Sequence, residues 1–168
     1  TLIDTAADFV RIIGKMSREN DWQAPPETEI REQVSAGASA MVRLMLRHND
    51  QIEVSEEALL EFRQQFLDDY EAGICVDSCV FTGLEEVLAA LEEKGVPWGI
   101  VTNKPRYLAE KLLDEMQLDG RCSALVCPDD VSRSKPDPEP MYMALEKLEI
   151  PRGAAGCVLY VGDHIRDI

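Results

Sequence analysis

Three short segments of this sequence carry side chains that could bind a phosphate or a metal ion. The first places Thr102 and Asn103 directly after the apolar run Trp-Gly-Ile-Val. The second holds Lys135 in a loop with three prolines, and the third places Asp163 and Asp167 after the run Cys-Val-Leu-Tyr-Val. Hydroxyl and ammonium groups can bind phosphoryl oxygens, and carboxylates are the ligands that Mg²⁺ prefers. Because open parallel sheets bind ligands beyond the carboxyl ends of their strands, these segments are candidates for a phosphate-handling site.

Each segment also has a purely structural interpretation. Thr102 or Asn103 could cap a helix that begins near residue 105. Lys135 could be a solvated loop charge, and the two aspartates could favour the dipole of a helix N-terminus. The Lys-Pro-Asp-Pro context of Lys135 favours a functional role, because the prolines stiffen its approach. All three segments lie near the ends of expected strands and occur in a fixed order. Three unrelated structural roles are therefore a poor explanation for the whole set.

Alternating elements in the second half of the chain must position these segments. Helices and strands in alternation predict a parallel sheet with right-handed crossovers. The expected helices span 84–94, 105–117 and 138–148, and the expected strands are the apolar runs 96–101, 124–127 and 158–161.

The first half of the chain has a different, helical pattern. Apolar residues at helical spacing predict helices at about 4–18, 27–35, 38–48 and 55–70, and Ser55 is a suitable N-cap for the last of them. No convincing strand is expected between residues 9 and 79. The paired prolines Pro25 and Pro26 predict a loop after the first helix, and this loop is a plausible hinge region.

Composition excludes several classes of partner. The 168 residues are 45% hydrophobic, enough for a buried core, and 32 acidic against 17 basic residues give a net charge of -15. This charge argues against binding to a nucleic-acid backbone. No apolar run approaches the roughly 20 residues of a membrane span. The five cysteines form no Cys-x-x-Cys pair, so neither a disulfide framework nor a zinc site is indicated, and a cytoplasmic protein is expected.

Taken together, the three segments resemble the second, third and fourth motifs of the haloacid dehalogenase-like hydrolases, which are mostly magnesium-dependent phosphatases. The resemblance implies an α/β fold in which residues 1–8 and 80–168 form a Rossmann-like parallel-sheet core and residues 9–79 form an inserted helical cap. It also implies truncation at both ends. The first family motif, Asp-x-Asp-Gly-Thr, supplies the aspartate nucleophile and the aspartate acid/base, and this chain opens like the tail of that motif, at Thr1. A further helix and strand are expected after residue 168.

The resemblance assigns a role to each candidate residue. Thr102 and the amide of Asn103 would orient the phosphoryl group, and Lys135 would screen the charges of the phosphate and the nucleophile. Asp163 would be the direct Mg²⁺ ligand. Asp167 would contact the ion through a bridging water molecule or would support the groups that bind it.

Two residues of the helical region are weaker candidates for substrate binding. Gly37 interrupts two helices, and a glycine lets backbone amides approach an anion closely, although a simple helix break is an equal alternative. Arg43 could contact the substrate from the helical cap or could be exposed on a helix.

The expected reaction is hydrolysis of a small phosphorylated metabolite through an aspartyl-phosphate, by a monomer or homodimer. The chain resembles phosphoglycolate phosphatases and, in residues 98–105, 127–129 and 133–140, bacterial N-acetylmuramic acid 6-phosphate phosphatases. The chain by itself is expected to be inactive, because its nucleophile would precede Thr1. Three alternatives stay open: a haloacid dehalogenase, which needs no metal; a phosphosugar mutase; and a catalytically inactive, phosphate-binding paralogue.

Overall fold

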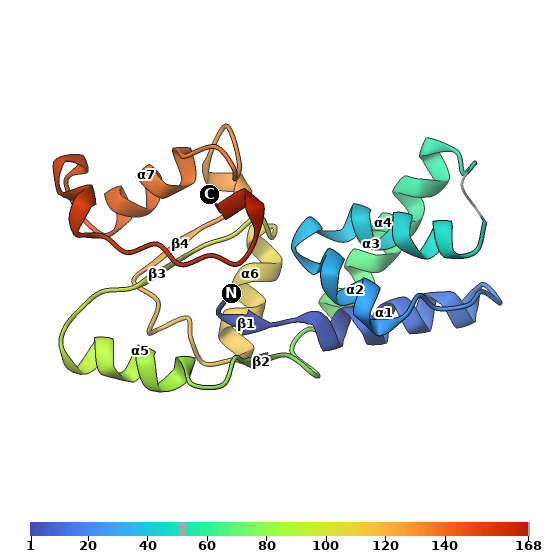
Figure 1. Cartoon of the computed structure of the whole chain (residues 1–168), viewed down its shortest axis with the longest axis horizontal. Coiled ribbons are helices and arrows are strands. Elements are labelled where there is room, and N and C mark those ends of the chain that lie inside the picture. Colours follow the sequence, from blue (N-terminus) through green and yellow to red (C-terminus); the bar gives the residue numbers. More distant parts are fainter. Residues whose placement is uncertain (51–52, 168) are drawn as a thin grey trace. The chain divides into compact units, whose positions relative to one another are not determined.

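The computed structural model describes residues 1–50 and 53–167 (Figure 1). It divides into two compact units, one made of residues 1–3 with the residues from 80 onward and one made of residues 4–79. The helical unit begins at Asp4 and includes all of helix α1, which begins at Ala6. Strands β1 (Ile3–Asp4) and β2 (Cys79–Val80) pair with each other where the chain passes between the units.

The helical unit is built on the apolar faces of four helices. They are α1 (Ala6–Glu19), α2 (Glu27–Gln33), α3 (Ala38–His48) and α4 (Glu56–Ala72), with a 3₁₀ turn at Val34–Ala36. The buried face of α1 includes Phe9, Ile12 and Met16 at the spacing of a helix. The Phe9 ring packs edge-on against the ring of Tyr70, with 5.0 Å between centroids. As predicted, the Ser55 hydroxyl caps α4 by accepting a hydrogen bond from the Ala58 amide at 3.1 Å.

The other unit holds a short parallel sheet with helices around it. Its elements in chain order are α5 (Leu84–Glu93), β3 (Gly99–Val101), α6 (Arg106–Glu115), β4 (Ala124–Val126), a 3₁₀ turn (Pro128–Asp130) and α7 (Glu139–Lys147). Strands β3 and β4 run parallel, with Val101 opposite Val126, and α7 lies against both (Figure 1). The strands approach closely at Gly99, where a Cβ atom would lie 2.8 Å from the Ala124 carbonyl oxygen.

One predicted strand does not form. Residues 158–161 follow a 3₁₀ helix (Arg152–Cys157) and have no regular secondary structure, and their side chains are exposed, with Leu159 86% accessible. A strand requires backbone partners on a neighbouring strand, and within the described residues β3 pairs only with β4. The apolar character of residues 158–161 therefore does not suffice to form a strand without a neighbouring strand to pair with. Among the described residues, no helix combines the length and apolar character that crossing a membrane would require.

Candidate active site

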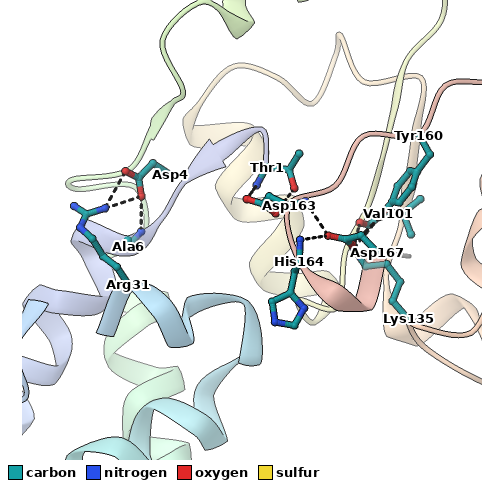
Figure 2. Close-up of polar contacts among 10 residues, drawn as sticks. All are labelled: Thr1, Asp4, Ala6, Arg31, Val101, Lys135, Tyr160, Asp163, His164 and Asp167. Carbon is teal, nitrogen blue, oxygen red and sulfur yellow. Dashed lines mark hydrogen bonds and ion pairs between the residues drawn. The ribbon is translucent and has the colours of Figure 1, made fainter. Parts of the chain in front are cut away.

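Lys135 lies at the carboxyl end of β3 and joins two of the three sequence segments. Its ammonium group donates hydrogen bonds to the Val101 carbonyl oxygen at 3.0 Å and to Asp167 Oδ1 at 2.8 Å (Figure 2). The Lys135 and Asp167 side chains are only 13% and 8% exposed. The structure thus holds a largely buried cation directly beside the residue that precedes Thr102.

The carboxylate of Asp167 uses both of its oxygen atoms. Oδ1 accepts hydrogen bonds from Lys135 and, at 2.8 Å, from the Tyr160 hydroxyl. Oδ2 accepts the backbone amides of Asp163 at 3.2 Å and His164 at 3.1 Å, while the His164 ring points away (Figure 2). Burial raises the pKa of Asp167, but the hydrogen bonds from Lys135 and Tyr160 outweigh it and bring the pKa to about 2. Asp167 is therefore an ionised bridge between Lys135 and the loop that carries Asp163.

Asp163 is more accessible than Asp167, with a side chain that is 56% exposed. Its carboxylate accepts a hydrogen bond from the Thr1 hydroxyl at 2.6 Å and lies 3.1 Å from the Thr1 amino group (Figure 2). The hydroxyl contact is the main cause of a lowered Asp163 pKa, and the charge of the amino group adds to it. In a longer chain that amino group would be a peptide N–H, and Asp163 would face a neutral donor.

The donor set suits Mg²⁺ better than a metal that needs several protein ligands. No cluster of three His, Cys, Asp or Glu side chains able to hold a metal occurs in the described part of the chain. Mg²⁺ typically takes only one or two carboxylates and completes its shell with water and phosphate oxygens. Asp163, with a side chain that is 56% exposed, fits such a role better than Asp167, whose side chain is only 8% exposed and paired with Lys135.

Thr102 and Asn103 both make local contacts that help to shape the site. The Thr102 hydroxyl oxygen accepts the Lys104 amide at 3.0 Å in a local turn, but Thr102 does not cap α6, whose N-cap residue is Pro105. The Thr102 O–H can still donate a hydrogen bond. The Asn103 amide group donates to the Lys135 carbonyl oxygen at 3.1 Å. The Asn103 Oδ1 atom is buried and has no hydrogen-bond partner among the described residues. Asn103 therefore ties the loop after β3 to the loop that carries Lys135.

The two candidates for substrate binding belong to the helical unit. Gly37 has φ 84° and ψ −179°, a conformation available essentially to glycine alone. Its carbonyl oxygen accepts a hydrogen bond from the Met41 amide at the start of α3. Arg43 is exposed on α3. Their contact with a substrate stays a prediction.

Sequence reasoning missed Tyr160 as a site residue. Its hydroxyl contacts Asp167 and accepts a hydrogen bond from Lys135 at 3.3 Å. Burial, together with its bond to Asp167, raises the pKa of Tyr160, which keeps the phenol neutral. In the sequence, Tyr160 is recognisable only as a tyrosine in an apolar run shortly before Gly162 and Asp163. A tyrosine in such a run could equally be a residue that packs in the core.

Comparison with known proteins gives matches along the whole chain. The chain is 40% identical over 168 residues to N-acetylmuramic acid 6-phosphate phosphatase from Pseudomonas aeruginosa, a match that covers 100% of this chain and 71% of that protein. It is 36% identical over 168 residues to phosphoglycolate phosphatase from Xanthomonas campestris, covering 100% of this chain and 72% of the relative.

Solved structures show the same fold. A predicted phosphoglycolate phosphatase from Haemophilus somnus matches with a TM-score of 0.78 at 22% identity, over 89% of this chain and 68% of that chain. A putative phosphoglycolate phosphatase from Lactobacillus plantarum matches with a TM-score of 0.76 at 20% identity, over 99% and 74% of the two chains. These matches confirm the predicted α/β class with a Rossmann-like parallel sheet. Because the model of the haloacid dehalogenase-like hydrolase family also matches residues 1–168, the chain belongs to that family.

Proposed function

We propose that the protein carrying this chain is a phosphoric monoester hydrolase that acts on a small phosphorylated metabolite. The observation that carries the proposal is the placement of Lys135, a largely buried cation held by Val101 and Asp167 at the carboxyl end of a parallel strand. Such a charge can neutralise a phosphate group where water competes poorly. The names of the two curated relatives, both phosphatases, support the same class.

Four residues of the chain have distinct tasks in this proposal. Lys135 attracts and partly neutralises the phosphoryl group, and the Thr102 hydroxyl donates a hydrogen bond to a phosphoryl oxygen. Asp167 keeps Lys135 charged and oriented. Asp163 would hold Mg²⁺, which when bound would neutralise charge that develops on the phosphate.

By family resemblance, the nucleophile of the proposed mechanism is an aspartate that would precede Thr1. By family resemblance, an aspartate shortly before Thr1 attacks phosphorus, and the ester oxygen leaves with a proton from a second aspartate. Water then hydrolyses the aspartyl-phosphate and releases inorganic phosphate. The contact of Thr1 with Asp163 supports this arrangement, because residues that shortly precede Thr1 would start beside the site (Figure 2).

The first substrates to test follow from the comparisons. The relative at 40% identity is named for N-acetylmuramic acid 6-phosphate and the one at 36% for phosphoglycolate. Specificity would reside in the helical unit, with Gly37 and Arg43 as candidates. We also propose a cytoplasmic enzyme, monomeric or homodimeric, with no nucleic-acid or membrane partner.

Phosphate release by the purified product of the complete open reading frame tests the proposal. We expect release from at least one of the two substrates with Mg²⁺, loss of release with EDTA, and restoration by added Mg²⁺. The Lys135→Met and Asp163→Asn variants should lose activity while keeping their circular dichroism spectra. Metal-independent release of halide would instead indicate a dehalogenase, and isomerisation without free phosphate would indicate a mutase. Folded protein with none of these activities would refute an enzymatic role toward these substrates.

A further inference from the structure

Arg106, Asp129 and Asp130 interlock the loop that follows β3 with the loop that follows β4. Asp129 Oδ2 accepts the backbone amide of Arg106 at 3.0 Å, at the first residue of α6. The preceding residue, Pro105, has no side-chain cap of its own, so Asp129 supplies the missing N-cap interaction from another loop. In return, the Arg106 guanidinium forms an ion pair with Asp130.

Asp130 also organises its own loop. The Oδ2 atom that receives Arg106 accepts the Cys127 amide at 2.8 Å, and Oδ1 lies 3.7 Å from the Lys147 ammonium group. Burial raises the pKa of Asp130, but the Cys127 amide and Arg106 lower it overall. Hydrogen bonds to Glu110 and then to Asp130 raise the pKa of Arg106. Both partners are therefore charged at neutral pH.

The interlocked loops are the ones that carry the site. Thr102 and Asn103 lie just before Arg106 in the chain, and Lys135 lies five residues after Asp130. The bond from Asn103 to the Lys135 carbonyl oxygen links the loops a second time. With side chains only 29% and 19% exposed, Arg106 and Asp130 are less solvated than an ordinary surface ion pair. Two separated links restrict both the distance and the angle between the loops.

We propose that Arg106 and Asp130 are positioning residues that hold Lys135 in register with Thr102. This inference rests on the proposed phosphatase function. Neither residue touches the substrate; both act through the loops that they join. Because small misplacements of catalytic groups lower the rate steeply, loss of the ion pair lowers turnover more than it lowers substrate binding.

Arg121 offers a matched control in the same unit. It is also 29% exposed and pairs with two carboxylates, those of Glu85 and Glu92, which lie on α5 and in neither loop of the site. The test compares Arg106→Met, Arg106→Lys, Asp130→Asn and Arg121→Met in the product of the complete open reading frame. Asp130→Asn is informative because an amide oxygen can still accept the Cys127 amide. The measurements are kcat, KM, the melting temperature and hydrogen exchange of residues 131–137.

We expect Arg106→Met and Asp130→Asn each to lower kcat about tenfold while KM changes less than about twofold. Arg106→Lys should recover part of kcat. The double variant should be about as impaired as Arg106→Met alone, because Arg106→Met already removes the pair with Asp130 as well as the pair with Glu110. Exchange across 131–137 should accelerate in Arg106→Met and not in Arg121→Met. Equal kcat and equal exchange in these two variants would overturn the inference. Absence of phosphate release by the unmodified protein would refute the proposed function instead, and exchange would still decide whether Arg106 orders the Lys135 loop.

Discussion

Replacement of Asp8 by asparagine should strongly destabilise the helical unit. Asp8 is fully buried, and its carboxylate accepts hydrogen bonds from the Arg11 guanidinium, the Asp77 amide at 3.0 Å and the Ser78 hydroxyl. Asparagine would turn an NH₂ group or a neutral oxygen toward these donors. Breaking a buried ion pair costs about 3–5 kcal/mol. The cost of breaking the Asp8–Arg11 ion pair should lie at the low end of this range, because Arg11 is 37% exposed and keeps its 2.8 Å bond to Asp77. Including the weakened hydrogen bonds from the Asp77 amide and the Ser78 hydroxyl, we expect a total loss of about 3 kcal/mol in the free energy of unfolding.

Thermal unfolding followed by circular dichroism measures this effect. For a protein of about 150–250 residues, 3 kcal/mol lowers the melting temperature by about 6–12 °C. The control is Glu27→Gln, which breaks the Glu27–Arg31 pair between side chains 58% and 41% exposed and should cost less than about 1 kcal/mol. If Asp8→Asn lowers the melting temperature no more than this control does, the reasoning about the buried carboxylate is refuted.

The same carboxylate makes stability depend on pH in a defined direction. Burial raises the pKa of Asp8, but the bonds from Ser78, Arg11 and the Asp77 amide outweigh it and leave the pKa below its ordinary value of 3.8. The contribution of Asp8 is therefore complete above about pH 4 and is lost as the pH falls through the lowered pKa. The difference in stability between the unmodified protein and Asp8→Asn should be constant from about pH 5 to 8 and should narrow below about pH 4. A difference that grows on acidification would contradict this sign.

Three further substitutions test the site and the backbone. Lys135→Met should reduce kcat by about a hundredfold or more in a phosphate-release assay, because it removes the cation beside the phosphate and leaves Asp167 without its ion-pair partner. Asp163→Asn should change the melting temperature by less than about 2 °C, since its side chain is 56% exposed, while it weakens Mg²⁺ activation; unchanged activation at limiting Mg²⁺ would exclude Asp163 as a ligand. Gly37→Ala should cost about 1–3 kcal/mol in urea unfolding, because φ is 84° there although nothing lies within 4 Å of the added Cβ; Gly120→Ala, which has equal space and no positive φ, should be near neutral.

The failed strand at 158–161 shows one limit of sequence reasoning. Apolar composition there is compatible with burial, but strand formation depends on a neighbouring backbone that local sequence does not specify. The helices were predicted more accurately because their hydrogen bonds join residues four apart. The periodic apolar residues of α1 and the Ser55 cap of α4 are examples in which local signals decide the element.

The residues that carry chemistry were recognisable by type and order, and the family resemblance suggested a role for each, but their contacts were not predictable. Lys135 stood out through its proline-rich context, and Asp163 and Asp167 through their spacing. The family resemblance suggested different roles for the two aspartates, and the folded arrangement adds a physical difference between them. The Asp163 side chain is 56% exposed, whereas the Asp167 side chain is 8% exposed and paired with Lys135. Tyr160 was missed because a tyrosine in an apolar run gives no sign of where its hydroxyl lies.

The sequence by itself determined the family resemblance, the alternation of helices and strands, and the candidate set at Thr102, Lys135 and Asp163. These properties reside in residue types and short spacings. The tertiary structure alone decided that Lys135 meets Asp167 and that Arg106 meets Asp130, pairs separated by 32 and 24 positions. Contacts over such distances depend on the packing of whole elements, and their energies depend on burial, so local sequence could not have predicted them.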